Sequence, residues 1–485
     1  MSLHNLELLL PYGLTGIGAL IVLLLGVLPG NKNNKIPYIG SVVILLLTIF
    51  QVGTLFHYNA RIENFVAINP LTLATFELCA AGGLATILMA QYYPKLNQHV
   101  DEAFYGLIII AVLGTFLLVS AINLLAAFIG MELIAIPMFA LIAWNPKRKG
   151  AIEGAIKYAV TATVAAAFFI FGIVLIYFGT GTLIMNEIPQ ALMGPDAIPS
   201  LVNIGIVLLL IGVAFELALA PFHCWLADAF QSAPAPIMAF IGSIAKIAVL
   251  IFVIHFAMSI APIWGDFNSV LWVLVLLSIL LGNLLALRQT NIKRMLAYSS
   301  VAQFGYILMA LACVSDGTSI SMVEGLRAAA YYGFSYAIMN MVVFAVIAMM
   351  SKYNPTGELA GYRGLGRRYP LAGGAMVIAV LSLAGIPPTA GFFAKLFLFT
   401  AVLNSGHIGF VILAALGSAI SVFYYLRILL AFFAKEPQPS VSVSTTGRYS
   451  VTESIDFGST LVMTICAVGT IAFGLFAQTA LNMMF

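Results

Sequence analysis

Six charged side chains lie well inside long apolar stretches of this 485-residue chain: Glu77, Glu132, Glu216, Lys246, Lys395 and Arg427. A charge at the centre of a membrane-spanning helix is unfavourable by about 2.5–3.5 kcal/mol on insertion scales, so each group needs an ion partner or a function. Carboxylates and amines in an apolar interior can accept and release protons, although any one of them can equally be half of a structural ion pair. Four of the six lie at mid-depth, and we expect them to form a proton relay: Glu132, Glu216, Lys246 and Lys395.

The composition predicts the kind of element that holds these residues. Of the chain, 62% is hydrophobic and only 8% is charged, which is too little charge to cover a soluble protein of this size. Apolar runs of about 18 or more residues predict membrane-spanning helices. We therefore expect an all-α integral membrane protein with fourteen spans near 8–28, 36–56, 66–92, 103–121, 123–144, 155–179, 201–227, 234–257, 268–288, 296–314, 325–350, 371–402, 408–434 and 457–482.

The distribution of Lys and Arg between the loops supports this count. Odd-numbered loops and span edges hold 16 of these residues, even-numbered ones hold 2, and 3 lie inside spans. Because Lys and Arg stay on the cytoplasmic side, the odd loops are predicted to be cytoplasmic and both termini periplasmic, in a bacterial inner membrane. No Lys or Arg precedes the first apolar run, so we expect that run to be a retained helix rather than a signal peptide.

Spans 7 and 12 are interrupted by proline in their middles, at Pro221 and Pro387. The two prolines are 166 residues apart, almost the separation between the starts of spans 4 and 9. This match predicts two inverted five-helix repeats with discontinuous helices 7 and 12, a pattern that points to an ion site near the bilayer midplane. The alternative is that the prolines merely kink their helices. The predicted units are 1–101 (three helices), 102–257 and 258–434 (the repeats), and 435–485 (a cytoplasmic loop and the last helix).

The remaining titratable residues in the spans are weaker candidates. Glu77 lies near the outer interface and Arg427 can reach the cytoplasmic side, so we expect structural roles for both. His223 lies at the break of span 7, where it can relay protons or satisfy carbonyls that the proline frees. His255 lies two to three turns beyond the lysine of span 8, toward the outer face, and is a candidate for a role in proton exit.

No other chemistry is predicted for this chain. Its four cysteines stand singly in apolar runs, without metal-ligand or redox spacing. Phosphate-binding glycine loops, apposed haem-binding histidines and a nucleophile with its base are all missing from the sequence. The net charge of +3 is too small to predict a nucleic-acid partner. We therefore expect no cofactor in this chain.

Four segments resemble the antiporter-like subunits of respiratory complex I. They are 220–225 (Ala-Pro-Phe-His-Cys-Trp), 232–237 (Ser-Ala-Pro-Ala-Pro-Ile), 288–300 (Arg-Gln-Thr-Asn-Ile-Lys-Arg-Met-Leu-Ala-Tyr-Ser-Ser) and 381–389 (Leu-Ser-Leu-Ala-Gly-Ile-Pro-Pro-Thr). The likeness covers essentially the whole chain. The length argues against the largest member of the family, and Lys395 argues against the middle member, which usually has Glu there.

The resemblance implies a proton-translocating subunit of an NADH:quinone oxidoreductase. The pumping would be driven by quinone reduction elsewhere in a complex that uses NADH, FMN, iron–sulfur clusters and quinone. The implied partners are the lipid bilayer and the other membrane subunits of complex I, especially a neighbouring antiporter-like subunit. By family, Glu132 would be the glutamate of span 5, Lys246 the central channel lysine and Lys395 the lysine of the broken helix.

One residue departs from the family pattern, because a lysine is common where this chain has Glu216. Two carboxylates that approach closely cannot both ionise cheaply, and Glu132 and Glu216 would then titrate as a coupled pair. Our hypothesis is that Glu216 instead leans toward Lys246 and holds its charge.

Three other functions remain open on the sequence. A subunit of a cation/proton antiporter would share the fold and the motifs, and so would a membrane subunit linked to a hydrogenase. A scaffold subunit that only braces its neighbours would explain Glu216 as a sign of a lost channel. The presence of Glu132, Lys246 and Lys395 argues against the scaffold.

Overall fold

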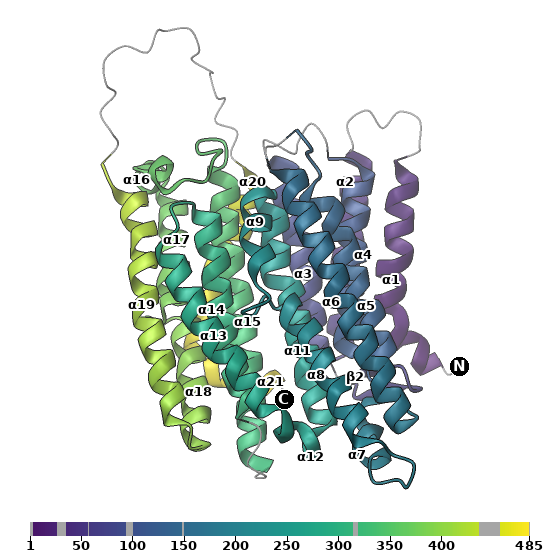
Figure 1. The fold of residues 1–485 in the computed structure, drawn as a ribbon. Coiled ribbons are helices and arrows are strands. Elements are labelled where there is room, and N and C mark those ends of the chain that lie inside the picture. The colour runs from purple at the N-terminus through teal and green to yellow at the C-terminus, as the bar shows by residue number, and fades with distance from the viewer. Residues whose placement is uncertain are drawn as a thin grey trace.

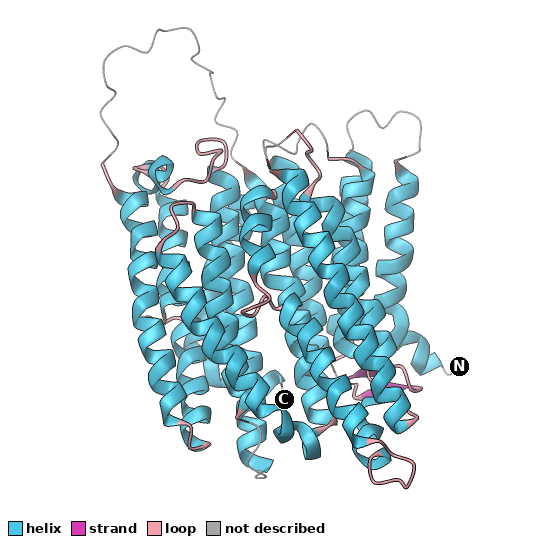
Figure 2. Cartoon of the chain, viewed as in Figure 1, coloured by secondary structure: helices cyan, strands magenta, loops and turns pink. Residues whose placement is uncertain are grey.

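A computed structural model describes residues 3–26, 35–56, 58–93, 100–147, 150–313, 319–435 and 456–484, nearly all of them helical (Figures 1 and 2). The helices of the first half are α1 (Leu3–Leu25), α2 (Lys35–Thr54), α3 (Pro70–Tyr92), α4 (Glu102–Ser120), α5 (Leu124–Ile142), α6 (Ala151–Thr180), α7 (Ile188–Ala191), α8 (Pro199–Glu216), α9 (Cys224–Ser232), α10 (Ala235–Ala239) and α11 (Lys246–Ser259). Those of the second half are α12 (Ala261–Trp264), α13 (Asn268–Leu287), α14 (Ile292–Ala312), α15 (Ser319–Met350), α16 (Leu365–Arg368), α17 (Pro370–Ala384), α18 (Ala390–Asn404), α19 (Ile408–Phe433), α20 (Phe457–Leu475) and α21 (Ala477–Met484). Short 3₁₀ segments cover Met185–Glu187, Gly265–Phe267 and Leu359–Tyr362, and a hairpin pairs β1 (Ala60–Ile62) with β2 (Val66–Ile68).

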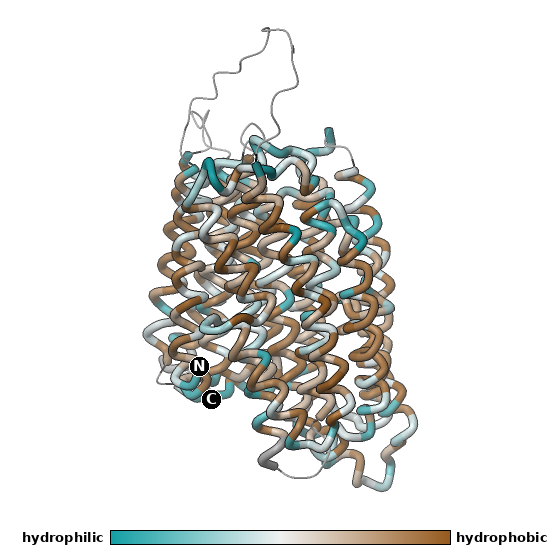
Figure 3. The backbone as a smooth tube through the Cα atoms, turned by 90° about the vertical axis from the view of Figure 1, so that its left-hand side faces the viewer, coloured by the Kyte–Doolittle hydropathy of each residue, from teal (hydrophilic) through white to brown (hydrophobic). Residues whose placement is uncertain are grey.

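The prediction of an all-α membrane protein is confirmed. Thirteen helical stretches in the described chain are long and apolar enough to cross a membrane. The shorter helices α17 and α18 together occupy the remaining predicted span, which gives the expected fourteen. Apolar residues fill the middle of the bundle, and polar residues gather toward its two ends (Figure 3). The first and last helices, α1 and α21, place the chain ends at the same end of the bundle (Figure 1).

We call the opposite end the basic end. Several short loops and helix ends there carry cationic side chains, including Lys147, Lys352, Arg363, Arg367, Arg368 and Lys435. This is the end that the loop charges predict to be cytoplasmic.

Polar residues at the helix ends explain where several spans begin. The side chains of Asn69, Asp101, Asn123 and Asn291 each accept a hydrogen bond from a backbone N–H in the first turn of α3, α4, α5 or α14. Such caps satisfy donors that the helix itself leaves unpaired. The predicted start of span 3 at residue 66 was wrong, because residues 66–68 pair with Ala60–Ile62 as a strand and the helix begins only at Pro70.

The centre of the bundle is formed by the segment from α10 to α11 and by α14 and α15. The apolar window of the first of these is entirely buried, whereas those of α2 and α19 are only 28% buried. Neighbouring helices approach closely where both carry glycine. A Cβ added to Gly172 of α6 would lie 2.5 Å from the carbonyl oxygen of Gly205 in α8, and the reverse distance would be 2.7 Å. Small residues of this kind allow helix backbones to come together in a membrane.

Both predicted helix interruptions are present. α8 ends at Glu216 and α9 begins at Cys224, so Pro221 lies in the break. α17 ends at Ala384 and α18 begins at Ala390, so Pro387 lies in the second break. The predicted span 7 was too short, because α9 continues to Ser232. The inverted relation of the repeats and the boundaries of the four units stay predictions.

A π-helical turn lies at the centre of span 8. It covers Phe240–Ala245 and directly precedes Lys246, the first residue of α11. Asn340 of α15 donates a hydrogen bond of 2.9 Å to Ser243 within this turn. π-Turns insert one extra residue into a helix and are frequent at functional sites.

Candidate functional site

Lys246 begins α11, and its side chain is 1% exposed. The amine donates to the backbone carbonyl of Leu217 at 2.9 Å and to the hydroxyl of Ser300, on α14, at 2.8 Å. It also lies 4.7 Å from the centre of the Phe304 ring, within the range of a cation–π interaction. Leu217 directly follows α8, so the amine sits at the end of the first half of span 7.

Lys395 lies in α18 and is 6% exposed. Its amine reaches back across the break to the end of α17 and donates to the carbonyls of Leu383 at 3.1 Å and Ala384 at 2.9 Å. A third hydrogen bond, of 2.8 Å, goes to the hydroxyl of Ser418 on α19. Gly385 ends α17 with a φ of +88°, a conformation that suits glycine and closes the helix.

The two lysines therefore share one arrangement, in which an amine lies at the carbonyl end of a half-helix. The last carbonyls of a helix have no partner within it and carry partial negative charge, which favours a cation. Among the residues that the structure describes, no carboxylate lies within 4.0 Å of either amine. A structural ion pair is thus not the arrangement that the described chain gives either lysine.

A neutral side chain, Gln303 of α14, connects the break of span 12 to two tyrosines. Its amide nitrogen donates to the carbonyl of Leu383 and to the hydroxyl of Tyr425, both at 3.1 Å. Its oxygen accepts a hydrogen bond of 2.5 Å from the hydroxyl of Tyr332. Because the carbonyl of Leu383 also accepts from Lys395, Gln303 and this lysine meet at one oxygen.

The same network extends toward Lys246. The hydroxyl of Tyr425 is hydrogen-bonded to Ser299, the neighbour of the Ser300 that accepts from Lys246. Polar side chains of α14, α15 and α19 thus link the carbonyl that accepts from Lys395 to the residue next to Ser300. Our reading of the sequence missed these residues, because a neutral polar side chain in a span lacks the energetic cost that makes a charge conspicuous. A glutamine inside the apolar run of α14 was the available signal.

Glu132 of α5 and Glu216, the last residue of α8, form the other part of the site. They lie near each other and near Tyr158 of α6. Tyr158 stacks on Trp225 with ring centroids 4.5 Å apart, and the indole N–H of Trp225 donates to the Phe215 carbonyl at 3.3 Å. The start of α9 is thereby attached to the end of α8 beside the two carboxylates.

The hypothesis that Glu216 leans toward Lys246 and holds its charge stays a prediction. Their charges interact, but within the described residues no ion pair joins them. The amine contacts the backbone at the break instead, because the carbonyl of Leu217 has no partner in α8 and lies 2.9 Å away. Any influence of Glu216 on Lys246 acts at longer range.

The two candidate histidines occupy different surroundings. His223 precedes α9 and packs edge-on against Tyr298, with ring centroids 6.1 Å apart, near the break of span 7. Nδ1 of His255 lies 2.9 Å from the carbonyl of Val119, and its Nε2 lies 3.4 Å from the amide nitrogen of Asn69. One neutral tautomer of His255, with the proton on Nδ1, satisfies both contacts. Relay roles for the two histidines stay predictions.

Arg427 has the structural role that the sequence indicated. Its guanidinium donates to the carbonyls of Leu287 at 2.6 Å and Gln289 at 2.9 Å, and so caps the end of α13. Glu77 is only half-buried in α3, and its role stays a prediction.

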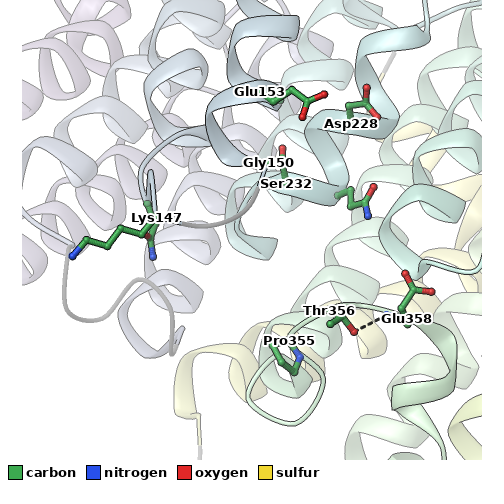
Figure 4. A pocket seen from close by; sticks show the side chains of 11 residues that line it. Lys147, Gly150, Glu153, Asp228, Ser232, Pro355, Thr356 and Glu358 are labelled. Atoms are coloured by element: carbon green, nitrogen blue, oxygen red, sulfur yellow. Dashed lines mark hydrogen bonds between the residues drawn. The ribbon is translucent and has the colours of Figure 1, made fainter.

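The reading of the sequence also missed a charged cluster at the basic end. Asp228 of α9 forms ion pairs with Arg294 of α14 at 2.5 Å and with Lys157 of α6 at 2.8 Å. Beside them lies a cavity of about 840 Å³, with Glu153 and Asp228 on one side and the loop that carries Glu358 on the other (Figure 4). Metal-ligand clusters of three or more His, Cys, Asp or Glu side chains are absent from the described ranges.

Comparison with known proteins identifies the family. The family described as "NADH:quinone oxidoreductase/Mrp antiporter, TM" matches residues 121–421. NADH-quinone oxidoreductase subunit N 1 of Solidesulfovibrio magneticus is 35% identical over 460 residues, which cover 91% of this chain and 95% of the relative. Subunit N of Geotalea uraniireducens is 33% identical, with 97% of each chain covered.

Solved structures show the same fold. A chain of respiratory complex I from Thermus thermophilus with bound aureothin superimposes with a TM-score of 0.78 at 29% identity, over 97% of this chain and 98% of that one. A chain of the Mrp complex from Dietzia has a TM-score of 0.83 at 20% identity, with 98% and 96% covered, and shows the fold alone. The chain therefore belongs to the NADH:quinone oxidoreductase/Mrp antiporter membrane family, as an antiporter-like subunit of the complex I N type.

Proposed function

We propose that this chain translocates protons across the bacterial inner membrane as a subunit of an NADH:quinone oxidoreductase. The observation that carries the proposal is the arrangement of the two lysines. Each amine is buried at a helix break and bonded to backbone carbonyls and a serine, and in the described chain neither has a carboxylate partner. A charge bound in this way can be lost and regained without breaking an ion pair.

The relay would work through charge. A proton gained or lost at Glu132 or Glu216 changes the electrostatic potential at Lys246, because the interior screens charges weakly. The charge of Lys246 in turn acts on Lys395 through the polar side chains around Gln303. The two lysines already have hydrogen-bond partners in place, so a change of charge at either amine needs only small movements around it.

The surroundings of Glu132 support a partner subunit. The residue is half-buried on a face of α5 that also exposes Leu125, Ile129 and Ile136. A carboxylate on such a face is unfavourable against lipid. We propose that a neighbouring membrane subunit of the complex covers this face. NADH, FMN, iron–sulfur clusters and quinone would be held by other subunits.

The test is NADH-driven proton uptake by inverted membrane vesicles that carry Lys246→Ala, with quinone reduction followed in parallel. We expect both activities to be lost, because the relay and the redox reaction are coupled. Lys435→Ala, which removes an exposed lysine outside the spans, is the matched control and should retain both. Normal rates of both activities in Lys246→Ala would refute the proposal and favour a scaffold.

A further inference from the structure

The half-helix that follows the first break is held at its far end by charged side chains. Nη1 of Arg294 donates to one carboxylate oxygen of Asp228 at 2.5 Å and to the side-chain oxygen of Gln231 at 3.0 Å. The other carboxylate oxygen of Asp228 accepts from Lys157 at 2.8 Å. The side chains of Arg294 and Asp228 are only 27% and 30% exposed, so solvent screens this pair less than a pair on an open surface.

The neighbouring residue of α14 also holds α9. Lys293 is 5% exposed, and its amine donates at 2.7 Å to the carbonyl of Ala233, the residue that directly follows α9. A cation at the carboxyl end of a helix is favoured by the helix dipole. Two consecutive cationic residues of α14 therefore attach α9 to α14. Arg294 binds the side chain of Asp228, and Lys293 binds the backbone carbonyl at the end of the helix.

The same face of α14 reaches the central lysine. Ser300 lies seven residues after Lys293, which is about two helical turns, and accepts a hydrogen bond from Lys246. The other partner of Lys246 is the carbonyl of Leu217, at the opposite side of the break from α9. The two partners of the amine thus belong to α14 and to the end of α8, and α9 is attached to both.

Solvent reaches this attachment from the basic end. The cavity of about 840 Å³ is lined by Asp228, Gln231 and Ser232 of α9 and by Glu153 of α6 (Figure 4). Across the cavity, Pro355, Thr356 and Glu358 form the facing wall. Helices α6 and α9 are in contact at Gly154, where an added Cβ would collide with the hydroxyl of Ser232. A small displacement of α9 would therefore change the shape of this cavity.

We infer that Asp228 and Arg294 are positioning residues of the relay, whose ion pair sets the place of α9 and with it the hydrogen bonding and solvent access of Lys246. The inference rests on the proposed function of Lys246. It assigns a role to two charged side chains at the basic end that contact neither Lys246 nor Lys395. Loss of the pair would remove one of the two attachments of α9 to α14, while the hydrogen bond from Lys293 to Ala233 and the Trp225 contact at the start of α9 would remain.

The test uses the assembled complex with Asp228→Asn or Arg294→Gln, and with the charge-swapped double variant Asp228→Arg, Arg294→Asp. Amide hydrogen exchange of a peptide covering residues 217–233 reports the position of α9, and NADH-driven proton uptake reports the relay. We expect each single variant to speed exchange in this peptide by at least about tenfold, because a hydrogen bond between charged groups is lost. Proton uptake should fall in the same variants. The charge-swapped double variant should partly restore both slow exchange and proton uptake.

Glu153→Gln is the matched control, because it removes a carboxylate of the same cavity that is paired only with Lys157 in the described chain. It should leave both readouts unchanged. Faster exchange with normal proton uptake, or reduced uptake with unchanged exchange, would each overturn the positioning role. If Lys246→Ala itself pumps normally, the proposed function fails, whereas the exchange result still shows whether the pair holds α9.

Discussion

Replacement of Gln303 by leucine tests whether the polar network between the two lysines matters. The substitution keeps the size of the side chain approximately, so little cavity or crowding is created. It removes three hydrogen bonds, to the carbonyl of Leu383 and to the hydroxyls of Tyr425 and Tyr332. The carbonyl of Leu383 keeps Lys395 as a partner, whereas the hydroxyl of Tyr332 loses its acceptor inside the bundle.

The size of the effect follows from these contacts. A hydrogen bond contributes about 0.5–1.5 kcal/mol net, and a buried donor left without a partner is unfavourable by about 1–3 kcal/mol. Gln303→Leu should therefore lower the free energy of unfolding by about 2–4 kcal/mol. Gln303→Glu is the matched control, because it keeps the shape and the oxygen that accepts from Tyr332. In its neutral form the glutamate also keeps one donor, for either the carbonyl of Leu383 or the hydroxyl of Tyr425. Gln303→Glu should therefore lower the free energy of unfolding by only about 1 kcal/mol.

The assay heats the purified complex and measures how much of this chain stays in solution, alongside proton uptake per NADH oxidised. We expect the leucine variant to lose the chain at a clearly lower temperature and to take up fewer protons per NADH. The glutamate variant should lie between it and the parent. A leucine variant with the parent's thermal midpoint and proton ratio would refute the view that Gln303 connects the two lysines.

Substitutions at three further positions, with Gly13 as a control position, probe separate parts of the chain. Glu216→Gln and Glu216→Lys should both lower proton uptake, because each alters the charge beside the first break; full activity in both would contradict a relay role for this carboxylate. Gly205→Ala should destabilise the bundle by about 1–3 kcal/mol, since its Cβ would lie 2.7 Å from the α6 backbone, whereas Gly13→Ala, with open space around it, should be neutral. Equal thermal midpoints for the two alanine variants would contradict the close packing. Arg427→Met should lower the thermal midpoint without changing the proton ratio, because the guanidinium caps α13; a changed ratio would instead indicate a part in the relay.

Much of the fold could be predicted because its physical signals are strong. Long apolar runs and the one-sided placement of Lys and Arg predict the spans, and the prolines at 221 and 387 predict the two breaks. The lysines were found because a charge in an apolar run is energetically conspicuous. Their partners were not, because backbone carbonyls at a break carry no sequence signal of their own.

The charged cluster at the basic end was missed for a different reason. Asp228 and Arg294 lie near span ends, where a charge is inexpensive and therefore unremarkable in a hydropathy reading. Only the folded chain shows that residues 66 positions apart form one ion pair. Sequence spacing also cannot tell whether an amine will meet a carboxylate or the backbone, and the amine of Lys246 donates to the carbonyl of Leu217.

The π-helical turn at Phe240–Ala245 decides which way Lys246 faces. Successive residues of an α-helix are rotated by about 100°, so one residue added or removed turns everything beyond it by that angle. Without the extra residue of the π-turn, Lys246 would point about 100° away from Leu217 and Ser300. Deletion of Ser243 should therefore silence the central lysine although its identity is unchanged. The number of residues in this turn is therefore as important to the site as the identity of Lys246. A relative with the same lysine but one residue fewer in the turn would direct its amine elsewhere.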